Sequence, residues 1–393
     1  MDRIEDPMIV LDRVSKTYPG GKLAVDALDL EVAEGALVTL VGPSGCGKST
    51  TLKMVNRLIE PTSGRILLDG DDVTSGDPVK LRRRIGYVIQ QVGLFPHQDV
   101  RSNVSTVPDL LGWNRKQATA RADDLLELVG LDPGEFGGRY PHQLSGGQRQ
   151  RVGVARALAA DPPVLLMDEP FGAVDPVVRA RLQDQFLELQ SELRKTVLLV
   201  THDIEEAVKL GDAVAVFAQG GRIAQYDTPA AVLGAPADDF VAEFVGAERG
   251  LRRLAVTEID DSDLLRAPMV RTSDTLAEAR VLLDSEGARW AVVLDGDDNL
   301  RGWVATESLE GAGVVGDRAR RMEAYVSRDA ALKDALATML RHDAGWVAVL
   351  DGDRLVGVLT PDSLHGALRR SVIAADEGVE VADIDLEAAG PLH

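Results

Sequence analysis

Apolar residues in this chain fall into short uninterrupted runs that alternate with longer stretches in which apolar side chains recur at helical spacing. The runs at residues 38–41, 164–167 and 197–200 are typical of strands buried on both faces of a parallel sheet. The stretches at 51–59 and 115–131 are typical of helices with one apolar face, to which residues 125–131 contribute in the second. This alternation predicts an α/β fold with a parallel-sheet core.

Shorter strands and turns surround the first helix. Residues 8–11 and 27–32 are predicted strands on either side of a turn at 18–21, residues 64–70 form a hairpin-like piece, and residues 85–89 form a further strand. Tyr18 lies in the first turn, where its ring could stack on a base or pack on its own hairpin. Gln90 and Gln91 follow the strand at 85–89, and an amide there could touch a metal-bound water or a γ-phosphate, or simply be polar surface.

The strand at 38–41 runs into a glycine-rich loop of the form G-x-x-x-x-G-K-S, and a helix follows the loop. This context predicts a phosphate-binding loop, because glycines let successive backbone N–H groups face an anion and the helix dipole favours negative charge. Lys48 can reach the β- and γ-phosphates, and the Ser49 hydroxyl can bind Mg²⁺. The pattern is too rare by chance to favour an ordinary glycine turn. The loop comprises Gly42, Pro43, Ser44, Gly45, Cys46, Gly47, Lys48, Ser49 and Thr50.

A second candidate anion site opens the predicted helix that follows residue 145. Ser145 is a good N-cap residue, and Gly146 and Gly147 expose backbone donors beside it, before Gln148. Helix starts of this kind are common, so the pattern alone does not separate an anion site from an ordinary cap.

Acidic and imidazole side chains follow two of the apolar strands. Asp168 and Glu169 come directly after the strand at 164–167, and His202 follows the strand at 197–200 with Asp203 as the N-cap of the next helix. Since ligands bind at the carboxyl edge of parallel sheets, we expect these groups near the phosphate-binding loop. Asp168 is then placed to hold Mg²⁺, and Glu169 to act as the general base toward water. A solvated acidic turn and a structural histidine are the alternatives.

Composition narrows the class of protein. The chain has 393 residues, 45% hydrophobic and 27% charged, which indicates two or three globular domains. A net charge of −20 argues against nucleic acid as the main partner, and no apolar run approaches the ~20 residues of a membrane span. The acidic N-terminus lacks the apolar segment of a signal peptide, and the single cysteine, Cys46, fits a reducing cytosol. Any role at a membrane must therefore act through another subunit.

Together these motifs resemble the nucleotide-binding subunit of an ABC transporter over about residues 8–245, most specifically in Leu-Ser-Gly-Gly-Gln at 144–148 shortly before Leu-Met-Asp-Glu-Pro at 166–170. The resemblance implies a P-loop ATPase with a parallel-sheet core and a helical subdomain, using ATP and Mg²⁺. It implies that Tyr18 stacks on adenine and that Gln90 is the lid glutamine and a metal ligand with Ser49 and Asp168. It further implies that Lys48, Glu169 and His202 are catalytic, and that Asp175 is the aspartate of the dimer loop, although Gly-Ala-Val at 172–174 departs from a frequent Ser-Ala-Leu.

The same resemblance implies how copies assemble. Each ATP would lie between the phosphate-binding loop of one copy and Ser145 to Gln148 of a second copy, in a head-to-tail dimer that opens after hydrolysis. Two membrane-spanning permease subunits would hold the pair at the cytoplasmic face of the inner membrane, with an extracytoplasmic binding protein as an indirect partner. A soluble ABC ATPase acting on nucleic acid, and a regulatory module without turnover, are alternatives from other classes.

Residues 267–309 and 322–364 repeat one another, each predicted as helix, strand, Asp-Gly turn, strand and helix. Residues 295–299 do not form a calcium loop, because Leu300 stands where glycine is needed and no glutamate closes it. The repeat resembles a pair of CBS domains, an α+β module that often binds adenine nucleotides. Ser308 and Ser363 stand where that family has ribose-binding aspartates, which argues against ordinary AMP or ATP sensing. Thr360 is retained in the second unit, whereas Ala305 stands in the first.

These boundaries predict an ATPase domain at 1–248, a CBS module at 249–372 (first unit about 255–312, second about 313–372) and an acidic, disordered tail at 373–393. An ABC ATPase with a C-terminal CBS pair resembles the energy-coupling subunit of importers for glycine betaine, carnitine, choline or proline, with an importer for another small solute as the alternative. Regulation could come from basic CBS surface on anionic lipid, released by salt, or from cyclic di-AMP held between the two units.

Overall fold

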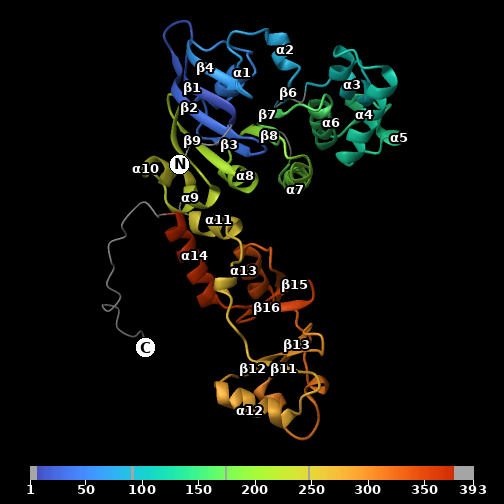
Figure 1. Cartoon of the computed structure of the whole chain (residues 1–393), viewed down its shortest axis with the longest axis vertical. Coiled ribbons are helices and arrows are strands. Elements are labelled where there is room, and N and C mark those ends of the chain that lie inside the picture. The colour runs from blue at the N-terminus through green and yellow to red at the C-terminus, as the bar shows by residue number, and fades with distance from the viewer. Residues whose placement is uncertain (1–6, 90–92, 173–174, 247, 376–393) are drawn as a thin grey trace. The chain divides into compact units, whose positions relative to one another are not determined.

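The computed structural model describes residues 7–89, 93–172, 175–246 and 248–375 (Figure 1). The chain divides into two compact units. The first comprises Met1–Val232 and Pro236–Gly246, and the second comprises Leu233–Ala235 and Ala247–His393.

Two sheets form the body of the first unit. The six-stranded sheet is parallel except for β10, at one edge, which pairs antiparallel with β9. Its order is β10 (Arg222–Asp227), β9 (Ala213–Ala218), β3 (Leu37–Val41), β8 (Thr196–Val200), β7 (Val164–Asp168) and β6 (Ile85–Val88). The antiparallel sheet has the order β2 (Leu23–Ala33), β1 (Pro7–Thr17), β4 (Ser63–Leu68) and β5 (Asp71–Asp72). The apolar runs at 38–41, 164–167 and 197–200 are therefore parallel strands, as predicted.

Helix α1 (Lys48–Val55) shares one apolar core with both sheets. Leu52 and Met54 of α1 are fully buried in this core together with Ile9 of β1 and Leu198 of β8. Because α1 starts directly after β3 and its loop, this packing fixes the loop at the carboxyl edge of the parallel sheet. The helix ends at Val55, before the predicted end at residue 59, and Arg57 beyond it takes a left-handed φ of 47°.

The remaining helices of the first unit are α2 (Pro78–Arg82), α3 (Val100–Leu110), α4 (Arg115–Leu128), α5 (Pro133–Phe136), α6 (Gly146–Leu158), α7 (Pro176–Leu193), α8 (Ile204–Leu210), α9 (Pro229–Gly234) and α10 (Asp239–Val245). Among them, α3, α4, α5 and α6 gather beside the sheets, whereas α8 packs on β3 and β9 of the parallel sheet (Figure 1). Except for α9, these helices start at N-cap side chains that accept backbone N–H groups: Asp77, Asp99, Asn114, Asp132, Ser145, Asp175, Asp203 and Asp238.

Helix α4 ends three residues earlier than the predicted 115–131. Gly130 adopts a φ of 70°, which closes the helix, and the chain turns away before Leu131. Leu128, predicted to lie on the apolar face, is 40% exposed, whereas Leu125 and Leu126 are buried.

The second unit contains the two expected repeats. Each forms a three-stranded sheet in which a short strand pairs parallel with the second strand, and the second pairs antiparallel with the third. The sheets are β11 (Met269–Arg271), β12 (Trp290–Leu294), β13 (Leu300–Ala305), and β14 (Tyr325–Ser327), β15 (Val347–Asp351), β16 (Arg354–Leu359). The helices are α11 (Arg249–Val256), α12 (Leu276–Glu286), α13 (Leu332–Arg341) and α14 (Pro361–Ala375).

The repeats end differently, which corrects the expectation that both close on a helix. The second repeat closes on α14, but the first closes on a single 3₁₀ turn at Thr306–Ser308. Gly311 and Gly313 follow that turn with φ values of 92° and 143°, so the helical path is broken there. Helix α14 runs past residue 373, the predicted start of the tail, and residues 376–393 lie outside the described residues.

Tryptophans at equivalent positions join the two repeats. Trp290 and Trp346 stack with their ring centroids 3.9 Å apart and their planes 7° apart. Apolar residues of both sheets, among them Val292 and Val358, surround this stack. The Asp-Gly turn after β12 is a tight hairpin: the Asp295 carboxylate accepts backbone N–H groups of Asn299 and Asp297 and pairs with Arg301, which lowers the pKa of Asp295 to about 2.

None of the helices in the described part of the chain combines the length and apolar character that a membrane crossing requires.

Candidate functional site

The loop between β3 and α1 has the backbone geometry that its glycines predict. Gly42 and Gly47 have φ values of 152° and 113°, and a β-carbon would lie 2.4 Å from the Phe217 carbonyl at Gly42 and 2.5 Å from the Ala24 carbonyl at Gly47. Only glycine fits such close backbone approaches. The contact with Ala24 also brings the start of β2 against the loop.

Lys48 holds its positive charge inside this loop. Lys48 is buried, with 5% of the residue exposed, and its Nζ donates to the carbonyls of Gly42 at 2.6 Å and Pro43 at 3.0 Å. Cys46 is buried beside it, with Sγ 3.6 Å from the same nitrogen. The loop therefore presents backbone N–H groups and an ammonium from one segment, which is a site for a polyphosphate.

The first residue of α1 after Lys48 meets the end of a neighbouring strand. Ser49 Oγ donates to Asp168 Oδ1 at 2.8 Å, and Asp168 is the last residue of β7. Ser49 and Asp168 are far apart in the sequence, and the parallel sheet brings their side chains together. Hydroxyl and carboxylate oxygens are ligands that Mg²⁺ prefers, so this pair of side chains could hold a Mg²⁺ ion beside a bound phosphate.

Glu169 and His202 also meet at this edge. Glu169 Oε2 lies 3.3 Å from His202 Nδ1, with the two side chains 24% and 57% exposed. Glu169 adopts a φ of 46°, and its N–H donates to the Val200 carbonyl at 2.9 Å, which turns its side chain out of the strand direction. A carboxylate with one side open to water is suited to accept a proton from a water molecule.

A buried carboxylate near the end of β8 was not predicted from the sequence. Glu206 of α8 is buried, Gln183 Nε2 of α7 donates to its carboxylate at 3.0 Å, and burial raises the pKa of Glu206. In the sequence Glu206 looks like its exposed neighbour Glu205. The two glutamates differ only in the face of α8 that they occupy, because Glu206 faces Gln183 of α7 and Glu205 faces solvent.

Ser145 to Gln148 form the predicted cap at the start of α6. Gln148 N–H donates to Ser145 Oγ at 3.2 Å, and Ser145 N–H donates to Gln148 Oε1 at 2.8 Å, which makes a reciprocal capping box. Ser145 and Gly146 remain exposed. Whereas α1 packs on β2, β7 and β8, α6 packs on α3, α4, β6 and α7. The structure thus places this motif in a different part of the unit from the phosphate-binding loop.

The other candidate residues are placed as follows. Tyr18 lies, half-buried, in the turn after β1, where its N–H donates to the Lys22 carbonyl at 2.9 Å and Lys16 Nζ lies 5.5 Å from its ring. Asp175 is the exposed N-cap of α7 and accepts the Val178 N–H at 3.1 Å. Gln90, expected as a lid and a metal ligand, lies outside the described residues, as does Gln91.

This combination of loop, carboxylates and capped helix is that of an ABC-type ATPase. A family model described as "ABC transporter" matches residues 25–172, and one described as "CBS domain" matches residues 315–370. The chain belongs to the ATP-binding proteins of ABC transporters, as relatives of nearly its whole length show, and it is an ATP-binding ATPase that carries a CBS domain. The fold class and the resemblance inferred from the sequence are thereby confirmed.

Particular relatives narrow the comparison. The chain is 45% identical over 376 residues to OpuCA of Bacillus subtilis, a glycine betaine/carnitine/choline transport ATP-binding protein; the match covers 94% of this chain and 98% of OpuCA. It is 45% identical over 362 residues to the osmoprotectant import ATP-binding protein OsmV of Salmonella typhimurium, covering 90% and 94%.

Solved structures resemble the first unit. A dimeric, post-hydrolysis structure of the ATP-binding cassette MJ0796 bound to ADP and Pi matches with a TM-score of 0.51 and 35% identity, covering 56% of this chain and 99% of that chain. The cbiO1 protein of Clostridium perfringens, part of the ABC transporter complex cbiONQ, matches with a TM-score of 0.55 and 29% identity, covering 59% and 93%.

Proposed function

We propose that this protein is the energy-coupling subunit of an importer for quaternary-amine osmoprotectants of the glycine betaine, carnitine, choline or proline type. The observation that carries the proposal is the similarity to OpuCA and OsmV over at least 90% of the chain. That similarity extends past the ATPase part into the repeats, which general ABC cassettes lack. The proposed organisation is an ATPase domain at 1–248, a regulatory CBS pair at 249–372 and an acidic tail.

The phosphate-binding residues have distinct proposed roles. Lys48 neutralises the β- and γ-phosphates, to which the backbone N–H groups of the loop from Gly42 to Thr50, Pro43 excepted, also donate. Ser49 and Asp168 would hold Mg²⁺, which when bound neutralises charge on the phosphate oxygens. Their mutual distance of 2.8 Å supports this pairing. Tyr18 stacks on adenine, and Gln90 completes the metal site as the lid residue.

Hydrolysis depends on the pair at the end of β7 and β8. Glu169 accepts a proton from the attacking water, and His202, 3.3 Å away, holds the carboxylate and senses the γ-phosphate. The nucleotide bound by a second copy is contacted by residues at the start of α6, namely Ser145, Gly146, Gly147 and Gln148. Asp175 lies at the interface between the two copies. The dimeric structures of the related cassette MJ0796 support an assembly of two copies.

We place this dimer beneath two membrane-spanning permease subunits, at the cytoplasmic face of the membrane. The test is reconstitution of the chain with its permease subunits, followed by ATP-dependent uptake of labelled glycine betaine, choline, carnitine and proline. Uptake of one of these compounds that disappears in the Glu169→Gln complex supports the proposal. A complex that transports another solute, and none of these four, refutes it.

The CBS pair is proposed to regulate turnover through ionic strength. Ser363, at a position where the family binds ribose, is engaged in a reciprocal cap with Thr360: Ser363 N–H donates to Thr360 Oγ1 at 3.2 Å, and Thr360 N–H donates to Ser363 Oγ at 2.9 Å. Because the Ser363 and Thr360 side chains already hydrogen-bond to this helix start, they argue against ordinary nucleotide binding at this position. Exposed ion pairs such as Arg271–Asp298 at 2.7 Å are weakened by salt, as is contact with anionic lipid.

Two measurements separate the regulatory proposals. Turnover of the complex that rises with salt in anionic vesicles, but not in zwitterionic ones, supports lipid-dependent ionic-strength sensing. A shift of the melting temperature with cyclic di-AMP, and none with AMP, combined with salt-independent turnover, would replace it with dinucleotide binding.

A further inference from the structure

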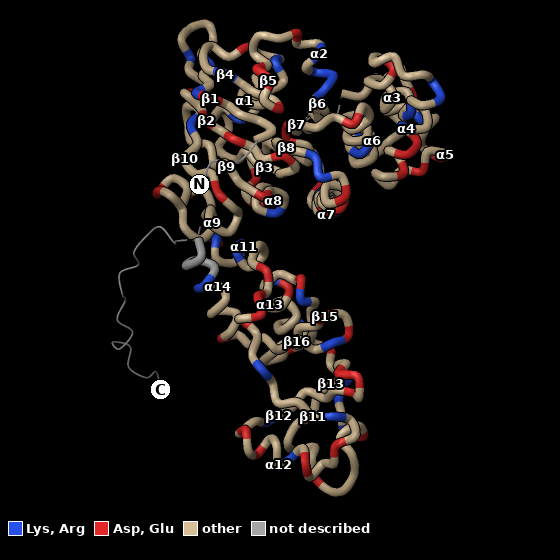
Figure 2. Tube along the Cα trace, viewed as in Figure 1, with Lys and Arg blue, Asp and Glu red and all other residues tan. Residues whose placement is uncertain are grey.

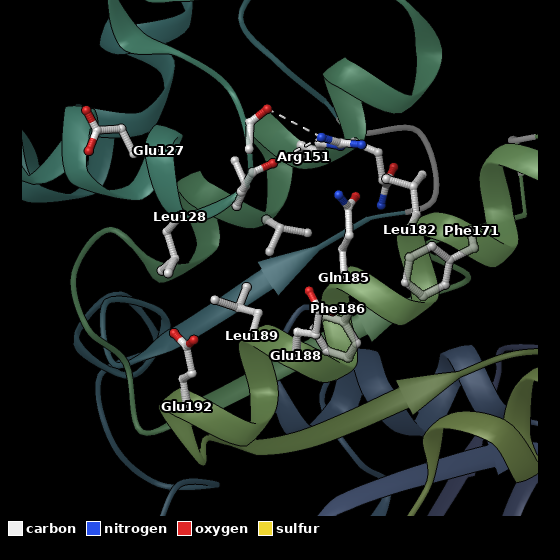
Figure 3. A pocket seen from close by; sticks show the side chains of 14 residues that line it. Glu127, Leu128, Arg151, Phe171, Leu182, Gln185, Phe186, Glu188, Leu189 and Glu192 are labelled. Carbon is white, nitrogen blue, oxygen red and sulfur yellow. Dashed lines mark hydrogen bonds between the residues drawn. The ribbon is translucent and has the colours of Figure 1, made fainter. Parts of the chain in front are cut away.

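A cavity of about 200 Å³ lies within the first unit, away from the phosphate-binding loop (Figure 3). Its walls come from the end of α4, the middle of α6 and one side of α7. In Figure 3, Gln185, Phe186 and Leu189 rise from α7 toward Leu128 and Arg151 on the other side. Leu128, the last residue of α4, is 40% exposed and lies at the mouth of the cavity.

Two glutamine side chains line this cavity with opposite, unpaired polar atoms. Nε2 of Gln150 is a donor and Oε1 of Gln185 is an acceptor; both atoms are buried, and neither has a hydrogen-bond partner. Gln150 as a whole is only 3% exposed. A buried amide without a partner costs ~1–3 kcal/mol, so a ligand that supplies both an acceptor and a donor gains by entering.

The rest of the wall is apolar and aromatic. Phe171 and Phe186 meet edge to face with centroids 6.2 Å apart, and Leu182 and Val154 are buried beside them. Small-molecule sites are typically apolar cavities with a few convergent polar groups. The wall thus fits an aromatic or branched apolar body with one amide-like group.

Charge at the rim excludes one class of ligand. Glu127, Glu188 and Glu192 are exposed around the cavity, and acidic positions follow α7 in Figure 2. The Arg151 guanidinium instead binds the carbonyls of Val129 and Gly130 at 3.3 and 3.4 Å, where it caps the end of α4. The rim therefore repels carboxylates and favours a neutral or cationic ligand.

The two walls belong to helices that begin in the proposed ATP sandwich. Helix α6 starts after Ser145 and α7 starts after Asp175, and near those starts a β-carbon at Gly147 would lie 3.2 Å from Val178 Cγ1. The cavity lies about one to three turns from the start of α6 and about two to five turns from the start of α7. A ligand in the cavity contacts both α6 and α7 and therefore sets the distance between the two helices.

We propose that this cavity is an allosteric site for a small neutral or cationic amide with an apolar body. Its carbonyl accepts from Gln150 Nε2 and its N–H donates to Gln185 Oε1. The ligand changes ATP turnover by fixing α6 against α7 without competing with ATP, and this second statement rests on the proposed sandwich role of Ser145 and Asp175.

Binding is tested on the full chain without nucleotide. We label the Leu and Val methyl groups and add benzamide, 4-(aminomethyl)benzamide or benzoate, which share a ring but differ in the donor and in charge. Such small ligands bind in the millimolar range. The expected result is saturable shifts of the methyls of Leu128, Val154, Leu182 and Leu189 with both amides, and none with benzoate. Equal shifts with benzoate, or no shift with any probe because an ordered water bridges the two glutamines, overturn the proposal.

Two variants locate the site. Gln185→Leu should weaken benzamide binding about fivefold, the loss expected for one hydrogen bond. Leu128→Trp, at the exposed mouth, should block entry entirely without disturbing the core. The matched control is Gln117→Leu, an exposed glutamine of α4 outside the cavity, which should leave binding unchanged. Unchanged binding in both cavity variants refutes the assignment.

The coupling to turnover is measured separately. In the reconstituted complex, 4-(aminomethyl)benzamide should change the maximal rate of ATP hydrolysis without changing the ATP concentration at half-maximal rate, and Leu128→Trp should remove the effect. Binding without any change in turnover would overturn the coupling. Failure of binding while transport persists would overturn this site and leave the proposed transport function intact.

Discussion

Replacing Glu169 by glutamine tests the proposed chemistry most directly. Glutamine has nearly the shape of glutamate, so it can keep the left-handed φ of 46° and the position 3.3 Å from His202. It loses only the negative charge and the ability to accept a proton. The change therefore separates the base role of Glu169 from its structural role.

The size of the effect follows from the environment of the pair. His202 is 57% exposed, so the lost contact costs at most about 1 kcal/mol of folding stability. Loss of a general base lowers the rate by about 10²–10⁴, which is roughly 2.7–5.4 kcal/mol in the barrier. We therefore expect turnover to collapse in a chain that stays folded and still binds ATP.

The assay is phosphate release by the reconstituted complex, with ATP binding measured on the same preparation. Glu205→Gln, an exposed glutamate two residues along the chain from Asp203, is the control and should turn over normally. If Glu169→Gln binds ATP and retains more than about a tenth of wild-type turnover, Glu169 is not the base.

Three further changes probe the fold around the site and the repeats. Gly47→Ala places a β-carbon 2.5 Å from the Ala24 carbonyl at a φ of 113°, so ATP affinity, measured by nucleotide titration, should fall about tenfold or more. Trp346→Ala removes the stack on Trp290 and should lower the free energy of unfolding of the second unit by about 2–4 kcal/mol, measured by urea denaturation. Burial raises the pKa of Tyr226 to about 12. The neutral phenol therefore stabilises the fold fully below the unfolded pKa near 10, and this stabilisation is lost as the pH rises toward 12. Denaturation measured as a function of pH should show this loss.

Each of these has a matched comparison. Gly76→Ala meets no atom within 4 Å and should leave ATP affinity unchanged; an equal loss would mean that glycine content, and not the close approach, matters. Trp113→Ala, at a residue 37% exposed, should cost far less than Trp346→Ala. Tyr226→Phe should flatten part of the alkaline loss of stability, and an unchanged pH profile would contradict the assignment to Tyr226.

The phosphate-binding loop could be predicted because all its determinants are contiguous. Strand β3, the glycines and α1 follow one another directly, so local rules suffice. Asp168 and His202 could be placed together because each follows an apolar strand, and parallel strands end at the same edge. The contact between Ser49 and Asp168 follows from the same reasoning.

Other features depend on contacts that no local pattern encodes. Strands β11 and β14 are three residues long, too short to show a period, and exist only because β12 and β15 pair with them. The unequal ends of the repeats depend on the left-handed glycines at 311 and 313. The amides of Gln150 and Gln185 come from different helices, and nothing in the sequence indicates that they share a cavity.

The unequal ends of the repeats bear on stoichiometry. A duplicated segment whose first half stops at the 3₁₀ turn Thr306–Ser308 and whose second continues into α14 does not offer two equivalent clefts. Any effector that enters this module should therefore saturate in two steps of different affinity, or fill a single cleft per chain. A titration curve with one class of two identical sites would be incompatible with that asymmetry.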